Sequence, residues 1–146
     1  MRRIHTSIFL DRDEAAEVVR QLSGPVVWGE WLSEFSWDHF VTLTFRYPVS
    51  DEAATREVRR WIRRLEQRAQ GRIGRFLVFE TDAGGDIHVH AHLEGTSKLA
   101  EGHVRSTWRS GISEACPYDP NRGASHYVSK RMSSSDLIWE FARRAA

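Results

Sequence analysis

The chain has 146 residues, of which 40% are hydrophobic and 28% are charged, and this composition is typical of one globular domain. The mean hydropathy is −0.51, and no apolar run reaches the roughly 18 residues of a membrane-spanning helix, so we expect no membrane partner. The one cysteine, Cys116, excludes an internal disulfide.

The net charge of +1 hides an uneven distribution along the chain. Residues 46–75 carry nine basic and four acidic side chains, whereas residues 76–120 carry three basic and seven acidic ones. Arginine supplies 19 of the 21 basic residues, and its planar guanidinium binds phosphate through two parallel hydrogen bonds. Basic segments of this kind favour a nucleic-acid partner, and acidic clusters favour cations.

Strands and helices are predicted to alternate along the chain. Apolar residues recur at helical spacing in some segments and at every second residue in others. In chain order we predict helices at 11–22 and 26–37, a strand at 39–46, a helix at 51–69, strands at 73–82 and 86–93, a helix near 98–110, a strand at 112–118, and helices near 124–132 and 135–144. This alternation, with at least one antiparallel hairpin, predicts an α+β fold with helices packed on one sheet.

The chain is predicted to form one domain, residues 1–146. Residues 1–37 are expected to be a helical N-terminal extension, residues 38–132 the core with the chemical motifs, and residues 133–146 a C-terminal helix.

Three histidines alternate along the predicted strand at 86–93. Because side chains of a strand point alternately to opposite faces, His88, His90 and His92 share one face with Asp86 and Glu94. Neutral imidazole is the commonest metal ligand, so this face predicts a metal site. The alternative is an exposed polar face without a metal.

The preceding strand is predicted to supply a carboxylate ligand. If residues 83–85 form the turn, Glu80 lies opposite His88, and His92 lies opposite the apolar Phe76. This register favours His88, His90 and Glu80 as metal ligands, and leaves His92 as a possible metal or DNA contact. Two histidines and one carboxylate leave coordination positions open for substrate oxygens.

Tyr127 is the candidate nucleophile. On a helix, Lys130 and Arg131 follow it by three and four residues and are therefore its neighbours. Two adjacent cations favour the phenolate and hold a phosphate nearby. The alternative is a packed tyrosine beside solvated basic side chains.

Taken together, these motifs resemble those of the HUH endonucleases, and among them the single-tyrosine rolling-circle replication initiators, or Rep proteins. Residues 40–45, Phe-Val-Thr-Leu-Thr-Phe, are similar to the first family motif. The segment His88-Val89-His90 is similar to the second, and Tyr127-Val128-Ser129-Lys130 to the third. The resemblance covers roughly residues 38–132.

The resemblance implies a ferredoxin-like or RRM-like HUH fold, with a central antiparallel sheet of about five strands. It also implies an enzyme that nicks single-stranded DNA at a specific site and forms a covalent 5′-phosphotyrosine. Tyr127 would be the nucleophile, Lys130 would position the phosphate, and His88, His90 and Glu80 would bind Mn²⁺ or Mg²⁺. Mixed nitrogen and oxygen ligation suits Mn²⁺ better. Predicted DNA contacts are Thr42, Thr44, Arg59, Arg63 and Arg131.

Two departures from the family pattern matter. A third histidine follows the pair, and no Gly-Lys-Ser/Thr phosphate loop occurs, so we expect either a host helicase acting in trans or an excised nuclease domain. The resemblance implies a cytoplasmic protein of a prokaryotic host, plasmid, phage or mobile element, or a nuclear one in a eukaryote. A single-tyrosine transposase and a non-catalytic nucleic-acid-binding module with a metal site are the alternatives.

Overall fold

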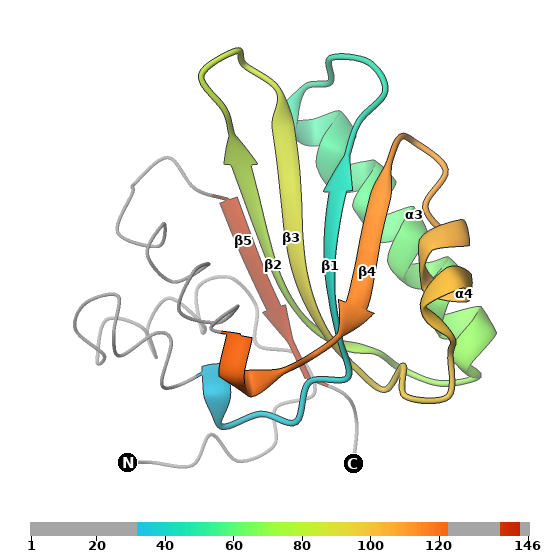
Figure 1. The fold of residues 1–146 in the computed structure, drawn as a ribbon. Helices are drawn as coiled ribbons and strands as arrows, with labels where there is room; N and C mark the ends of the chain where they lie inside the picture. The colour runs from blue at the N-terminus through green and yellow to red at the C-terminus, as the bar shows by residue number, and fades with distance from the viewer. Residues whose placement is uncertain (1–31, 123–137, 144–146) are drawn as a thin grey trace.

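The computed structural model describes residues 32–122 and 138–143, and these form one five-stranded antiparallel sheet with helices packed on it (Figure 1). The strand order across the sheet is β4-β1-β3-β2-β5. In chain order the elements are β1 (His39–Thr44), α3 (Asp51–Ala69), β2 (Gly74–Thr81), β3 (Ile87–Glu94), α4 (Glu101–Ser106), β4 (Ser113–Pro117), a 3-10 turn η1 (Pro120–Arg122) and β5 (Ile138–Ala142).

The first four strands and two helices follow the order β1-α3-β2-β3-α4-β4, which is the ferredoxin-like arrangement. β5 extends this unit by pairing with the outer edge of β2. The prediction of an α+β fold with about five antiparallel strands is therefore confirmed. No helix in the two described ranges is long and apolar enough to cross a membrane.

Helix α3 forms where the sequence predicts it, because both of its ends are capped. The Ser50 side chain accepts a hydrogen bond from the Ala53 amide at the N-terminus, and Gln70 ends the helix in the left-handed conformation with φ of 54°. One stripe of the helix is buried against the sheet: Ala54, Val58, Trp61, Ile62 and Leu65.

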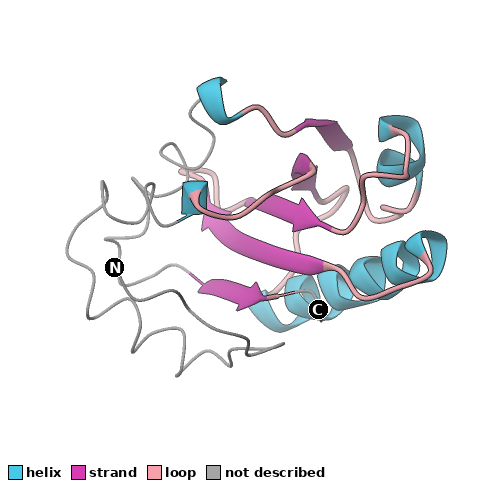
Figure 2. Cartoon of the chain, turned by 90° about the horizontal axis from the view of Figure 1, so that it is seen from below, coloured by secondary structure: helices cyan, strands magenta, loops and turns pink. Residues whose placement is uncertain are grey.

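Both helices lie on the same side of the sheet, as the view from below shows (Figure 2). On this side the main core is built from alternate residues of three strands, among them Val41, Leu77 and Val89, which pack with the apolar stripe of α3 and with Val104 of α4. Burial of this face fixes the registers of β1, β2 and β3, because a slip by one residue would turn the apolar set to the opposite face.

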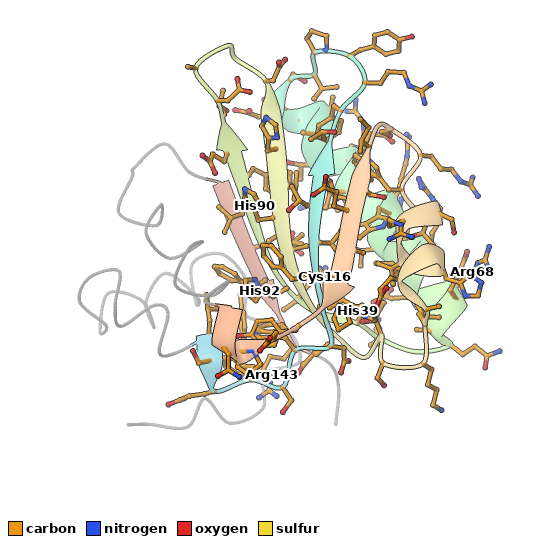
Figure 3. All side chains as sticks on the ribbon, in the orientation of Figure 1. His39, Arg68, His90, His92, Cys116 and Arg143 are labelled. Atoms are coloured by element: carbon orange, nitrogen blue, oxygen red, sulfur yellow. The ribbon has the colours of Figure 1, made fainter. Side chains whose placement is uncertain are left out.

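The opposite face of the sheet divides into an aromatic half and a polar half. In the aromatic half, Phe76, His92 and Phe141 are almost completely buried, and Phe35 packs 5.4 Å from Phe141 between ring centroids. In the polar half, toward the β2–β3 turn, the half-buried or exposed side chains are Thr42, Thr44, Glu80, His88 and His90. Figure 3 shows His90 farther toward that turn than His92.

The predicted helix at 135–144 is wrong, because residues 138–142 form the edge strand β5. Phe141 pairs in register with Phe76, and the Glu140 carboxylate lies 2.8 Å from the Arg75 guanidinium. The apolar spacing in this segment fits either structure, and pairing with the free edge of β2 decides between them. The helix predicted near 98–110 is also shorter than expected, at 101–106.

Candidate active site

The β2–β3 hairpin has the register that the sequence predicts. Glu80 lies opposite His88, and Phe76 lies opposite His92. The hairpin closes through Asp82, whose Oδ1 accepts hydrogen bonds from the Gly84 and Asp86 amides, both at 2.9 Å. Gly85, with φ of 86°, supplies the left-handed residue of the turn.

β1 adds its two threonines to the same face of the sheet. Thr42 lies opposite His90, and Thr44 lies opposite His88. The motif Thr-Leu-Thr and the motif His-Val-His, which are more than 40 residues apart in the sequence, are therefore direct cross-strand neighbours. This pairing brings together all of the predicted site residues that belong to the sheet.

Each of the two histidines has its own carboxylate. The Nε2 atom of His90 lies 3.4 Å from Glu80 Oε2, and Nε2 of His88 lies 2.9 Å from Asp82 Oδ2. Glu80 is thus in register with His88 but reaches diagonally to His90, since diagonal neighbours in a sheet are within reach of long side chains. The bond from His88 is the main cause that lowers the pKa of the Asp82 carboxyl, with the Asp86 amide next.

Asp82 is a site residue that the sequence analysis does not identify. The sequence does place it opposite Asp86, where it belongs to the turn. Its second role is visible only from the side-chain geometry, because Oδ1 holds the turn while Oδ2 binds His88.

The imidazole of His90 is held on three sides. Its Nδ1 lies 3.4 Å from Thr42 Oγ1, its Nε2 faces Glu80, and the Phe40 ring stacks on it with an angle of 5° between the planes. If Nδ1 carries the proton and donates it to Thr42, the lone pair of Nε2 points toward Glu80. This tautomer is the one a metal ligand needs, so Thr42 is placed to orient the ring.

These side chains supply suitable donors for Mn²⁺ or Mg²⁺, but as two pairs. No group of three His, Cys, Asp or Glu side chains in residues 32–122 and 138–143 is arranged compactly enough to hold an ion. His90 and Glu80 provide one nitrogen and one oxygen ligand on neighbouring strands. His88, with 35% of its side chain exposed, can serve as a third ligand if it turns from Asp82 toward this pair.

His92 lies in the aromatic half of the sheet and is completely buried. Phe40, Trp37 and Tyr118 surround its ring, with centroid distances of 5.1, 5.4 and 5.6 Å. Burial, with a smaller effect of His90, lowers its pKa from 6.5 to about 3, so the ring is neutral at physiological pH. This environment favours His88 and His90 as the metal-binding pair.

The buried His92 is expected to make the protein acid-sensitive. Its pKa is lower in the folded state than in the unfolded state, so acid favours unfolding once the pH falls below 6.5. Between pH 7.5 and pH 5, we expect the free energy of unfolding to fall by about 2 kcal/mol more in the wild type than in His92→Leu. Urea denaturation at both pH values measures this difference. The control is His103→Leu, at an exposed site in α4, which is expected to retain the wild-type pH dependence.

The remaining predicted site residues lie elsewhere. Arg59 and Arg63 are exposed on α3, which packs on the face of the sheet opposite the histidine pair. Tyr127, Lys130 and Arg131 lie outside the described residues, as do the predicted helices at 11–22 and 124–132 and most of the one at 26–37.

The comparisons with known proteins give one positive finding. The family model of the replication-associated protein ORF2 matches residues 38–136, which is more than half of the chain and includes β1, the hairpin and the Tyr127 motif. No curated protein and no solved structure matches the chain. By the family match, and in agreement with the motifs that the sheet brings together, the chain belongs to this family of replication-associated proteins.

Proposed function

We propose that the protein is a metal-dependent HUH endonuclease and strand transferase that nicks single-stranded DNA at a specific site to start rolling-circle replication. The observation that carries this proposal is the alignment of Thr42, His90 and Glu80 across β1, β3 and β2 on a half-buried polar face. Membership of a replication-associated family supports it independently.

In this proposal, His90, Glu80 and His88 hold Mn²⁺ or Mg²⁺, and Thr42 orients the His90 ring. The ion, when bound, polarises the scissile phosphate. Asp82 keeps the hairpin closed, so that His88 and His90 stay beside each other on β3. The exposed edge of this polar face leaves room for a single strand.

Tyr127 is the proposed nucleophile, with Lys130 as the residue that positions the phosphate. The phenolic oxygen forms a bond to phosphorus and loses its proton to solvent, while the bond from phosphorus to the 3′ oxygen breaks. The 3′ oxygen takes up a proton and leaves as a free 3′-OH. The 5′-phosphotyrosine conserves the phosphodiester energy, so the strand can later be rejoined.

A covalent-adduct assay tests the proposal without knowledge of the nick site. The protein is mixed with Mn²⁺ and a randomised single-stranded DNA library labelled at the 3′ end, because the attached fragment would keep that end. We expect a labelled band at protein size that survives SDS and heat, and that disappears with EDTA. Retention of DNA on a native gel without a denaturation-resistant band would contradict the proposal and indicate a non-catalytic binding module.

A further inference from the structure

We propose that a surface pocket beside the end of β1 binds a nucleotide of the DNA strand just outside the cleavage site. This inference rests on the proposed function and adds a binding site to it. The pocket, which we call the β1-end pocket, has a volume of about 350 Å³. Its lining includes Phe45, Arg46, Tyr47, Glu57, Arg109 and Ser110.

The charge of the β1-end pocket suits a phosphate. Arg46 and Arg109 are exposed, and within the described part of the chain neither forms an ion pair. The carboxylate of Glu57 is already bound on both oxygens: Oε1 lies 2.6 Å from Arg60 Nη1, and Oε2 accepts from Ser110 Oγ at 2.9 Å. Two free guanidinium groups therefore dominate the pocket, and guanidinium binds phosphate in bidentate geometry.

The exposed apolar side chains suit a base. Tyr47 is 73% exposed and Ile112 is 71% exposed, and these two are the exposed large hydrophobic residues of the described chain. Tyr47 lines the pocket, and Ile112 lies beside it because its carbonyl oxygen accepts a hydrogen bond from the Thr44 amide at 2.9 Å. Bases of single-stranded nucleic acids stack on such aromatic side chains without regard to sequence.

The backbone around the pocket is firmly held. The Arg46 amide donates to the Ser110 carbonyl at 2.8 Å, and Trp108 Nε1 donates to the Thr44 carbonyl at 3.0 Å. Gly111 permits this close approach, because a Cβ atom there would collide with the carbonyl oxygen of Thr44. A pocket with a fixed backbone can bind a nucleotide without the entropic cost of ordering a loop.

The pocket is also close to the proposed cleavage site. Thr44 lies opposite His88, and Tyr47 follows Thr44 by three residues, which span at most ~10 Å. A strand bound at the histidine pair can therefore continue past the end of β1 to the Arg46 and Arg109 guanidinium groups. The combination of two free arginines with an exposed tyrosine favours single-stranded DNA over a protein partner.

Metal-free DNA binding tests the pocket separately from cleavage. The probe is a fluorescein-labelled oligo(dT) of about 20 nucleotides, a length that exceeds one single-strand binding site, and the readout is fluorescence anisotropy in EDTA. We expect Tyr47→Ala to raise Kd roughly 5- to 100-fold, with Tyr47→Phe and Tyr47→Trp close to wild type. The double variant Arg46→Ala, Arg109→Ala should weaken binding and lower the salt slope by about 1 to 2. Arg68→Ala, in the last turn of α3 and away from the pocket, is the matched control.

Wild-type affinity in the Tyr47→Ala and double-arginine variants would overturn the inference, and so would a Tyr47→Phe variant as weak as Tyr47→Ala. Circular dichroism confirms that each variant is folded. Because the assay contains no metal, a failed covalent-adduct assay together with weakened oligo(dT) binding would refute the nuclease proposal and leave the pocket as a DNA site. The reverse combination would refute the pocket alone.

Discussion

Replacing His90 by alanine is expected to abolish Mn²⁺-dependent cleavage, with a loss of at least about 100-fold. His90 contacts Glu80 on one side and Thr42 on the other, so its removal leaves the proposed ion without the nitrogen ligand that joins the three central strands. The side chain is largely buried, with 12% exposed, and no neighbouring imidazole of the described chain is placed to replace it. The nicking rate, measured over a Mn²⁺ titration on an oligonucleotide recovered from the adduct assay, gives the result.

Three further variants make this test specific for the pair His88 and His90. His88→Ala should also abolish cleavage, and Glu80→Ala should raise the Mn²⁺ concentration needed. His92→Leu, which keeps most of the volume of the buried ring in the aromatic half, should retain most of the activity above pH 7. His92→Ala is less suitable, because it would leave a cavity among Phe40, Trp37 and Tyr118 and lower stability. Loss of cleavage in His92→Leu with survival in His88→Ala would refute the assigned pair.

Replacing Tyr127 by phenylalanine is expected to eliminate the covalent adduct completely. The substitution removes the phenolic oxygen and keeps the ring, so the protein retains no atom at this position that can attack phosphorus. Oligo(dT) binding should remain within about twofold of wild type, since the removed hydroxyl is not a proposed binding group. The readout is the denaturation-resistant labelled band, compared at equal protein and Mn²⁺ concentrations.

Two other tyrosines supply the controls for this experiment. Tyr118 lies beside His92 in the aromatic half, and Tyr47 is exposed in the β1-end pocket. Tyr118→Phe and Tyr47→Phe should both still form the adduct. An adduct in Tyr127→Phe that is lost in one of these variants would move the nucleophile to that tyrosine.

The hairpin and β1 can be predicted from the sequence because each depends on a local pattern. Alternation of apolar residues fixes which face of each strand is buried, and the turn at 83–85 then places Glu80 opposite His88. Helix α3 has the bounds that the sequence predicts, because Ser50 and the acidic first turn mark its start.

The features that the sequence does not reveal depend on contacts between distant segments. β5 is a strand because it meets the free edge of β2, and residues 138–142 alone carry no sign of that edge. The diagonal contact from Glu80 to His90 depends on side-chain rotamers rather than on register. The division of one sheet face into aromatic and polar halves requires Trp37, Tyr118 and Phe141, which come from three separate parts of the chain.

The register of the sheet also has a consequence for the order in which the site assembles during folding. β2 and β3 are joined by a tight turn, and hairpins of this kind form within about 1–10 μs. Glu80, Asp82, His88 and His90 all belong to this one hairpin, whereas β1 reaches it only by pairing with a strand more than 40 residues later in the chain. Since non-local pairing is slow, we expect the two histidine–carboxylate pairs to be in place before Thr42 arrives to orient His90.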